Sequence, residues 1–325
     1  VCSGMWSLHS FRENTAAAAD PTQKEQAELV RNMALAMVSD IRSVLIKLAW
    51  QLQYLRLLAR EEFGPLHTHA ANLTMMLFAP LANRLGVSQL KWELEDLSFR
   101  FLEPQQYKSI AKDLANTRLQ RENYIQEFIQ LINSMLEEAN IKASVYGRPK
   151  HIYSIWKKMQ RKHVPIDQLY DLRAIRIIVE DNNTCYEVLS IVHARWQHIQ
   201  EEFDNYISHA KSNGYQSIHT VVIGPLDRPV EIQIRTQDMH QFAELGVAAH
   251  WRYKEGGRYD RNLERVINSM RRLLDADIDD GELIEDFQSE AFSDRVFVVT
   301  PKGKVVDLIK GATPIDFAYA IHTDI

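Results

Sequence analysis

The spacing of apolar residues changes once along this chain, near residue 141, and this change limits the possible folds more than any other feature. Before it, apolar residues recur at the period of a helix, as in Val44, Leu48 and Leu52. After it, helical stretches alternate with strand-length runs rich in β-branched residues, which read DLRAIRIIVE, SIHTVVIG and PVEIQIRT. The sequence therefore predicts an all-α part followed by a mixed α/β domain.

Length and composition are those of a globular protein of two or three domains, with 325 residues, 46% of them hydrophobic and 25% charged. Cys2 and Cys185 are too few for a disulfide framework or a metal site of four cysteines. No run approaches the roughly 18 uncharged apolar residues of a membrane span, so we expect a cytoplasmic protein without membrane contact. The chain lacks an initial Met, and we expect it to be a piece of a longer polypeptide.

A basic stretch stands out in a chain whose formal net charge is −5, because seven Lys or Arg and no carboxylate lie between Lys142 and Lys162. Apolar residues within it recur at helical spacing and predict a helix over 151–162; they are Ile152, Ile155, Trp156 and Met159. Arg148 and Lys150 precede its N-terminus, and a helix N-terminus itself favours anions. This arrangement predicts a polyphosphate site, although composition alone also allows a solvated basic helix or a nucleic-acid patch.

Two carboxylates follow on predicted strands. In PVEIQIRT, apolar residues alternate with Glu231, Gln233 and Arg235, so the three polar residues share one strand face. Asp171 starts the strand run DLRAIRIIV. Carboxylates on neighbouring strands that face cations suit Mg²⁺ and a nucleoside triphosphate, and one of them can accept a proton from an attacking hydroxyl. Taken singly, each acid also fits a surface or salt-bridge role.

The segment HAKSNGYQSIHT lies between the two acids. Asn213 and Gly214 predict a turn before a strand, which a plain connector also explains. In a functional interpretation, Lys211 contacts phosphate, Asn213 binds the edge of a base and Tyr215 stacks on its face.

Five motifs, in order, resemble those of the long RelA/SpoT homologues, a family that makes or breaks the alarmone (p)ppGpp. They span residues 146–256 and read YGRPKHIYSIWKKM, LYDLRAIRIIV, KSNGYQSIHT, VEIQIRT and HQFAELGVAAHWRYKEG. The upstream run FAPLANRLGVSQLKWELEDLSFRFL is similar to the family's link from hydrolase to synthetase domain. The run DRVFVVTPKGKVVDL, which predicts two strands around a turn, is similar to the start of its TGS domain.

The resemblance implies a nucleotidyltransferase-like fold that moves the β,γ-pyrophosphate of ATP onto the 3′-hydroxyl of GDP or GTP. By motif, the ATP-binding residues would be Arg148, Lys150, Ser154 and Lys158. Asp171 would bind Mg²⁺, and Glu231 would bind Mg²⁺ or activate the 3′-hydroxyl. The guanine-nucleotide pocket would comprise Lys211, Asn213, Tyr215, His219, Gln233 and Arg235. For His219, a purely structural role is an equal alternative.

The N-terminal part departs from the family's hydrolase pattern. In the family, VLIKLA is normally followed by a metal-binding Asp, then Arg, then His and Asn; the residues at these positions are here Trp50, Gln51, Gln53 and Tyr54. An indole cannot coordinate a hard cation such as Mn²⁺. His67 and His69 do not fit the family's metal motif either. We expect a degenerate hydrolase domain without hydrolase activity, kept as a scaffold or regulator.

The motif EEFDNY separates two kinds of family member. Bifunctional members carry a basic Arg-x-Lys-Asp there, whereas RelA-type synthetases carry Glu-x-Asp-Asp. Glu202 and Asp204 match the acidic version, and Asn205 departs from it at the last position. The motif indicates a RelA-type synthetase and leaves the choice between GDP and GTP open.

The expected fold class is a multidomain α+β chain. Its predicted parts are a degenerate hydrolase-like helical domain (1–105), a mixed α/β (p)ppGpp synthetase domain (106–256), a helical and acidic linker (257–293) and the start of a small β-rich TGS module (294–325). Eight of the residues 275–290 are acidic and none is basic, which predicts a solvated connector or, alternatively, an inhibitory contact with the basic stretch.

The family resemblance also implies partners. These are ATP and GDP or GTP as substrates, and the ribosome and uncharged tRNA through C-terminal domains beyond residue 325. A non-catalytic guanine-nucleotide or RNA-binding regulatory module is the alternative, and nucleotide binding without turnover would distinguish it from an enzyme.

Overall fold

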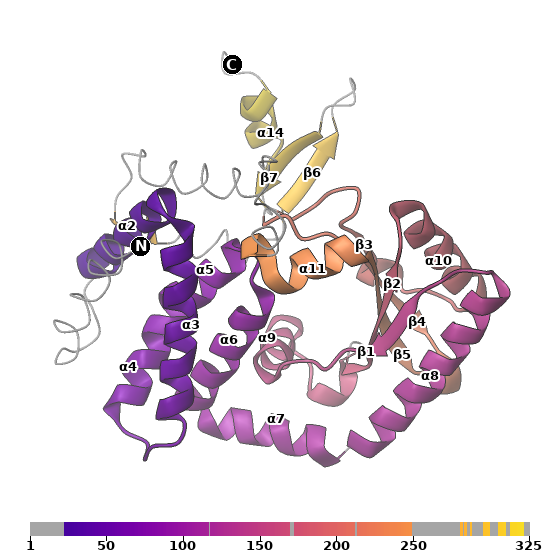
Figure 1. Ribbon diagram of the computed structural model, residues 1–325, viewed down its shortest axis with the longest axis horizontal. Coiled ribbons are helices and arrows are strands. Elements are labelled where there is room, and N and C mark those ends of the chain that lie inside the picture. The colour runs from indigo at the N-terminus through magenta and orange to yellow at the C-terminus, as the bar shows by residue number, and fades with distance from the viewer. Residues whose placement is uncertain are drawn as a thin grey trace.

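The computed structural model begins with a row of helices that lead into a mixed sheet (Figure 1). It describes residues 23–116, 118–169, 172–211, 213–248, 280–281, 283–284, 287, 295–299, 305–309 and 313–321. The helices of the first part are α2 (Gln23–Ser39), α3 (Ile41–Leu58), α4 (Pro65–Leu73), a π-helical turn (Thr74–Phe78), α5 (Ala79–Arg84), α6 (Ser88–Leu102), α7 (Pro104–Asn116) and α8 (Arg118–Glu138). The predicted all-α part is therefore confirmed.

Helices α2 to α6 pack around one hydrophobic core. Its members include Leu48 and Leu55 of α3, Leu81 of α5 and Leu94 of α6, all of them completely buried. Burying a leucine side chain contributes about 1.5–3 kcal/mol relative to leaving it exposed, so the helical spacing of these residues is what holds the bundle together. Helix α7 then begins at Pro104, and α7 and α8 run beneath the molecule toward the sheet (Figure 1).

Five strands form a mixed sheet in the order β1-β2-β5-β4-β3. Strands β2 and β5 are parallel, and the other neighbouring pairs are antiparallel. Their bounds are β1 (Ser144–Gly147), β2 (Ala174–Val179), β3 (Asp204–Asn205), β4 (Ile218–Ile223) and β5 (Pro229–Thr236). Strand β5 covers the predicted run PVEIQIRT from its first residue to its last.

The two faces of the sheet differ in chemistry. One face carries the predicted apolar residues, such as Ile177 and Ile232, which pack with α8 and with α10 (Asn182–Arg195) in a second core. The alternate residues point the other way and are largely polar. Helix α11 (Gln237–Leu245) contacts β2 and β5, and its side chains meet the polar face.

Helix α9 (Ile152–Lys162) confirms the helix predicted in the basic stretch and lies between α6 and β1 (Figure 1). Its apolar side packs with α6 and α7 in a third core that includes Phe99, Ile110 and Ile155. Short 3₁₀ turns follow at Ile166–Gln168, Gln200–Glu202 and Pro225–Asp227. Helix α6 thus contributes to the first core and to the third, and connects the helical part to the basic helix.

The C-terminal part contains an antiparallel pair, β6 (Arg295–Val299) and β7 (Val305–Ile309), followed by α14 (Pro314–Ile321). The predicted strand pair is confirmed, and its turn lies outside the described residues. Most of the predicted linker, residues 257–293, also lies outside them.

The acidic segment 275–290 differs from the expected solvated connector where the structure describes it. Leu283 and Phe287 are buried in the core of helices α2 to α6. Asp280 pairs with Arg31 of α2 at 2.8 Å, not with the basic stretch. The physical reason is that apolar residues among the acids are available to pack into the helical core, which the charge count alone does not reveal.

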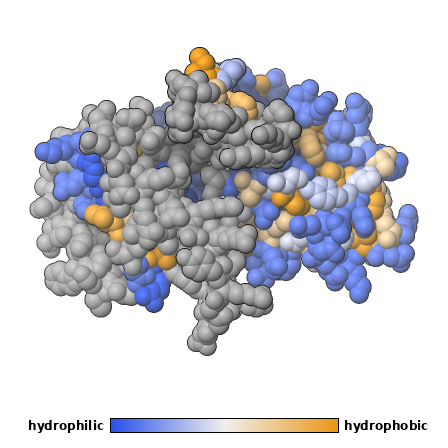
Figure 2. Space-filling view, turned by 90° about the horizontal axis from the view of Figure 1, so that it is seen from above, coloured by the Kyte–Doolittle hydropathy of each residue, from blue (hydrophilic) through white to orange (hydrophobic). Residues whose placement is uncertain are grey.

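On the face shown in Figure 2, hydrophilic residues make up most of the described surface, with small groups of hydrophobic residues between them. Among the described residues, no helix is both long enough and apolar enough to cross a bilayer.

Candidate functional site

A row of polar residues crosses the sheet on the face opposite its apolar core. Strand register aligns Tyr146 with Arg176, Arg176 with Gln233, Gln233 with His219 and His219 with Asp204. Each of the five strands thus contributes one polar residue to a continuous row. The alternation in PVEIQIRT predicted this face for β5, but the neighbours from the other strands follow only from the register.

Glu231 lies beside this row and is 8% exposed. Its Oε1 accepts a hydrogen bond from Nε2 of Gln233 at 2.8 Å and lies 3.5 Å from Nδ1 of His219. Its Oε2 lies 4.0 Å from a terminal nitrogen of Arg148. The structure therefore brings together four of the predicted site residues, two from β5, one from β4 and one from the segment after β1.

Burial keeps His219 neutral. Desolvation lowers the pKa of its imidazole to about 3; Glu231 opposes this shift, while Lys211, Arg148 and Arg235 add to it. A carboxylate can only accept, so Nδ1–H of the neutral ring points to Glu231 and Nε2 accepts the hydroxyl proton of Tyr215 at 2.8 Å. A chain of contacts thus links Tyr215 through His219 to Glu231.

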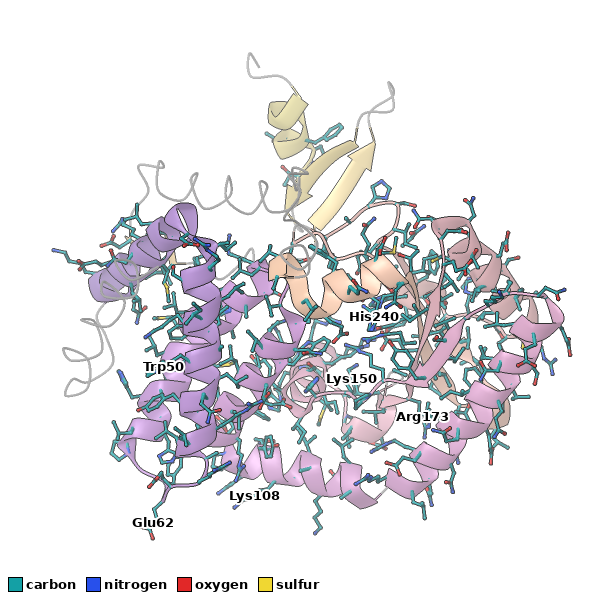
Figure 3. The ribbon with its side chains drawn as sticks, viewed as in Figure 1. Trp50, Glu62, Lys108, Lys150, Arg173 and His240 are labelled. Carbon is teal, nitrogen blue, oxygen red and sulfur yellow. The ribbon has the colours of Figure 1, made fainter. Side chains whose placement is uncertain are left out.

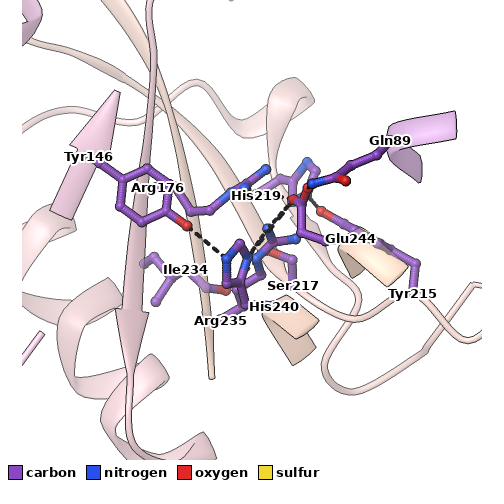
Figure 4. Close-up of polar contacts among 10 residues, drawn as sticks. All are labelled: Gln89, Tyr146, Arg176, Tyr215, Ser217, His219, Ile234, Arg235, His240 and Glu244. Carbon is purple, nitrogen blue, oxygen red and sulfur yellow. Dashed lines mark hydrogen bonds and ion pairs between the residues drawn. The ribbon is translucent and has the colours of Figure 1, made fainter. Parts of the chain in front are cut away.

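Arg235, predicted for the guanine-nucleotide pocket, holds α11 onto the sheet (Figure 4). Its guanidinium donates to Nδ1 of His240 at 2.7 Å and to Glu244 at 3.2 Å, and Arg176 donates to the same Glu244 oxygen at 2.9 Å. Burial raises the pKa of Glu244, but the two guanidiniums outweigh it and leave this pKa below its usual value. Because Nδ1 of His240 accepts, its Nε2–H donates to the hydroxyl of Tyr146 at 3.2 Å.

The basic helix meets the acidic motif. Lys158, predicted to bind ATP, lies 3.5 Å from a carboxylate oxygen of Glu202, and Lys162 pairs with the same carboxylate. Ser154 is half-buried in the first turn of α9. Lys150 precedes the helix and lies between α9 and the strands (Figure 3). The basic helix that carries the predicted ATP residues Ser154 and Lys158 is therefore in direct contact with the acidic motif through Glu202.

The N-terminus of α9 is not as open to anions as the sequence suggested. The backbone N–H of Tyr153 donates to Oδ1 of Asp96 at 2.8 Å, and Nδ1 of His151 lies 3.3 Å from Oδ2. The carboxylate of Asp96 therefore already occupies part of the positive end of the helix dipole. Arg148, Lys150 and Lys158 remain as the candidates for phosphate contact.

The predicted guanine loop forms a tight turn at Gly214, whose φ is +80°. The side-chain oxygen of Asn213 accepts from the N–H of Tyr215 at 3.1 Å, and its Nδ2 donates to the carbonyl of Asn83 at 3.0 Å. The ammonium of Lys211 lies 4.3 Å from the ring centroid of Tyr206. The loop is thus held both internally and by the helical part, with aromatic rings beside its cation.

Asp171, the second predicted carboxylate, lies outside the described residues. Among the residues that are described, no group of three or more His, Cys, Asp or Glu side chains is placed to hold a metal ion. Of the two predicted carboxylates, the structure describes Glu231. Carboxylate oxygens such as those of Glu231 are ligands that Mg²⁺ prefers.

Comparisons with known proteins agree with this geometry. Residues 147–258 match the region found in RelA / SpoT proteins, residues 2–88 an HD domain and residues 296–325 a TGS domain. The chain is 50% identical to the GTP pyrophosphokinase of Escherichia coli K12 over 330 aligned residues, which cover 99% of the chain and 44% of that protein. It belongs to the RelA/SpoT family.

Two further relatives show the range of activities named within the family. A GTP pyrophosphokinase of Haemophilus influenzae is 52% identical over 92% of the chain and 41% of that protein. A protein of Synechocystis named probable guanosine-3′,5′-bis(diphosphate) 3′-pyrophosphohydrolase is 43% identical over 94% of the chain and 41% of that protein. The chain spans less than half the length of the curated relatives that it matches.

In the region that matches an HD domain, the positions that follow VLIKLA carry uncharged side chains. Trp50 stacks on Tyr54 with ring centroids 5.5 Å apart, and the buried amide of Gln51 donates to Thr74 at 2.9 Å. His67 uses both ring nitrogens, because Nδ1 accepts from the N–H of Gly64 at 3.1 Å and Nε2–H donates to the carbonyl of Leu58 at 2.8 Å. Figure 3 shows Trp50 on the far side of α6 from Lys150.

The sequence did not mark several residues that contact the candidate site residues. Arg176 and Glu244 form the buried ion pairs beneath α11, and Trp92 and Asp96 of α6 contact the segment that carries Arg148 and begins α9. The alternation in DLRAIRIIV offered a signal for Arg176, since it lies on the strand face opposite Ile175, Ile177 and Val179. For the residues of α6 and α11 no local pattern marks the distant partner.

Proposed function

We propose that this chain transfers the β,γ-pyrophosphate of ATP to the 3′-hydroxyl of GDP or GTP and so makes (p)ppGpp. In this reaction the 3′-oxygen forms a bond to the β-phosphorus of ATP, the bond from that phosphorus to the oxygen shared with the α-phosphate breaks, and AMP leaves. The 50% identity to a GTP pyrophosphokinase supports the reaction class. The observation that carries the proposal is Glu231, buried and flanked by His219, Gln233 and Arg148.

In the proposed mechanism, Glu231 accepts the proton of the attacking hydroxyl or helps to hold Mg²⁺. Neutral His219 and the amide of Gln233 fix its orientation. Arg148, Lys150, Ser154 and Lys158 bind the phosphates of ATP, and Lys211, Asn213 and Tyr215 bind the guanine nucleotide. Glu231 and Asp171 would hold Mg²⁺, which neutralises phosphate charge when bound. Gln233 and Arg235 are also proposed to contact the guanine nucleotide, and Arg235 in addition links the sheet to α11 through His240 and Glu244.

Replacement of Glu231 tests the reaction. We expect Glu231→Gln to lower the rate of formation of 3′-pyrophosphorylated guanosine from ATP and GDP by at least about 100-fold, because the amide neither accepts a proton nor binds Mg²⁺ well. Chromatography of labelled nucleotides measures the product. Glu187→Gln, at an exposed position on α10, is the matched control and should retain full activity.

An unchanged rate in Glu231→Gln would contradict the catalytic assignment. Binding of GDP by the wild-type protein without any turnover, even with ribosomes and uncharged tRNA added to the full-length protein, would favour the non-catalytic module instead.

We further propose that the chain is a RelA-type synthetase without hydrolase activity, which acts in the cytoplasm. Trp50 at the position of the metal-binding Asp supports the absence of hydrolysis, and the acidic motif that contains Glu202 supports the RelA type. The ribosome and uncharged tRNA are the proposed partners, contacted through C-terminal domains beyond residue 325. Stimulation of synthesis by ribosomes with uncharged tRNA would support this, and its absence in the full-length protein would contradict it.

A further inference from the structure

One segment of the helical part, residues 83–96, contacts both proposed nucleotide sites. On the guanine side, the carbonyl of Asn83 accepts from Asn213, and Gln89 donates to Glu244 of α11 at 3.3 Å. On the ATP side, Trp92 and Asp96 contact the stretch from Arg148 to Tyr153. Trp92 and Asp96 lie between the matched HD and RelA/SpoT regions, in a part of the chain that neither match covers.

The indole of Trp92 packs against the residues that lead into α9. The guanidinium carbon of Arg148 lies 5.3 Å from the centroid of the Trp92 ring, within the range of a cation–π interaction. The ring of His151 stacks on the same indole, with centroids 4.9 Å apart and an interplanar angle of 26°. Trp92 is half-buried, so water screens these contacts less than it would on an open surface.

Two further contacts limit where the Arg148 side chain can go. Its backbone N–H donates to the carbonyl of Ala174 at 2.8 Å, which ties the chain to the start of β2. Its terminal nitrogen lies 4.0 Å from a carboxylate oxygen of Glu231 on β5. The guanidinium is therefore held between an aromatic face from the helical part and the proposed catalytic carboxylate from the sheet.

We propose that Trp92 is a positioning residue for ATP, which acts by holding the guanidinium of Arg148 in place, while Asp96 fixes the start of α9 next to it. This inference rests on the proposed function for the identity of the nucleotide. A flexible Arg side chain loses rotamer entropy when it binds phosphate, and a preformed contact with Trp92 removes part of that cost before ATP arrives. Loss of the indole face then weakens ATP binding and leaves GDP binding unchanged.

Substitutions of Trp92 that distinguish the effect of its aromatic face from the effect of its side-chain volume test the proposal. We expect Trp92→Leu to raise the KM for ATP about fivefold to tenfold, with the KM for GDP and kcat little changed, in line with the strength of a partly desolvated cation–π contact. Trp92→Phe, which keeps an aromatic face, should recover most of the affinity. Glu93→Gln is the matched control on the same helix, because Glu93 pairs with Arg56 on the surface.

A double-mutant cycle shows whether Trp92 acts through Arg148. In an Arg148→Ala background, Trp92→Leu should produce no further rise in the KM for ATP. The proposal would be overturned in favour of a packing role if Trp92→Leu raised the KM for ATP equally with and without Arg148→Ala. An equal loss of ATP and GDP affinity in Trp92→Leu would overturn it in the same way.

Binding measurements on the wild-type protein test the proposal even if Trp92→Leu does not fold. They also distinguish a failure of this proposal from a failure of the proposed function. The contribution of Trp92 to the tryptophan fluorescence is the difference between the wild-type protein and Trp92→Phe. This contribution should change on titration with a non-hydrolysable α,β-methylene analogue of ATP and should not change on titration with GDP. A Trp92 fluorescence that does not change when the analogue is added would overturn the proposal. If the wild-type protein binds the analogue through Trp92 but forms no product from ATP and GDP, the proposed reaction fails while the role of Trp92 stands.

Discussion

Helix α3 and the polar face of the sheet both bury polar side chains, but these side chains differ in charge and in how far their hydrogen bonds are made. In α3, the buried amide of Gln51 donates to Thr74, and His67 of α4 uses both ring nitrogens in hydrogen bonds with backbone groups. These side chains carry no carboxylate and their hydrogen bonds are made. On the polar face of the sheet, the buried groups are Glu231, Gln233, Arg176, Arg235 and, from α11, the partly buried Glu244.

The sheet also leaves hydrogen-bonding capacity unused. Among the described residues, six buried side-chain polar atoms make no hydrogen bond, and four of them belong to the sheet part: Nε of Arg173, Arg176 and Arg235 and Oε1 of Gln233. Buried polar atoms without partners are costly and are retained mainly where a ligand or a reaction needs them. The contrast is consistent with the proposed nucleotide site on the polar face of the sheet, whereas the polar groups of α3 make their hydrogen bonds within the fold.

Breaking the buried ion pairs should produce the largest difference between the two parts. We expect Glu244→Gln to lower the free energy of unfolding of the sheet part by about 3–5 kcal/mol, because it leaves Arg176 and Arg235 buried without their shared carboxylate. Urea unfolding followed by circular dichroism measures the loss. Glu122→Gln, which removes an exposed pair with Arg118, is the control and should change nothing measurable.

A urea midpoint for Glu244→Gln equal to that of the wild-type protein would show that other groups compensate the two guanidiniums. It would also remove the reason for treating α11 as anchored by charge.

The next largest effect concerns the buried His219. Its pKa is about 3 when folded and near 6.5 when unfolded, so below pH 6.5 the unfolded chain binds a proton that the folded chain does not. Stability therefore falls as the pH drops from 6.5 toward 3, by up to about 1.4 kcal/mol per pH unit. Because the His219 side chain is still 20% exposed, we expect a slope somewhat below this limit.

Replacing His219 by Gln should flatten that part of the pH profile, measured as the urea midpoint across this pH range. His209→Gln, at an exposed site in the same domain, should leave the slope as it is. A wild-type slope that persists in His219→Gln would assign the acid sensitivity to other groups.

The smallest effect is expected in α3. Trp50 is 38% exposed, and Trp50→Ala should cost only about 1 kcal/mol of stability and leave the rate of synthesis unchanged. Neither the wild type nor this variant should release pyrophosphate from (p)ppGpp with Mn²⁺, as measured by phosphate release after pyrophosphatase treatment. The comparison would be reversed if the wild-type protein released pyrophosphate from (p)ppGpp with Mn²⁺ and Trp50→Ala abolished this release. The helical part would then have a catalytic role.

Local patterns anticipated much of the architecture. The alternation in PVEIQIRT predicted β5 and its two faces, and the helical spacing in the basic stretch predicted α9. They did not predict the strand β1 or the buried side of the acidic segment. Side-chain alternation and helical period follow from backbone geometry over a few residues, so they are visible without knowledge of the rest of the chain.

The sequence by itself determined most of the helices and strands, and the polar face of strand β5 and of helix α9, because period and residue type act locally. Only the tertiary structure decided what each polar group meets: Asp96 bonds Tyr153 across 57 residues, Asn213 bonds Asn83 across 130, and Gln89 bonds Glu244 across 155. Such pairs depend on how α6, α9 and α11 pack against the sheet. This packing depends on the total burial of many side chains from different elements. A short stretch of sequence does not show that total.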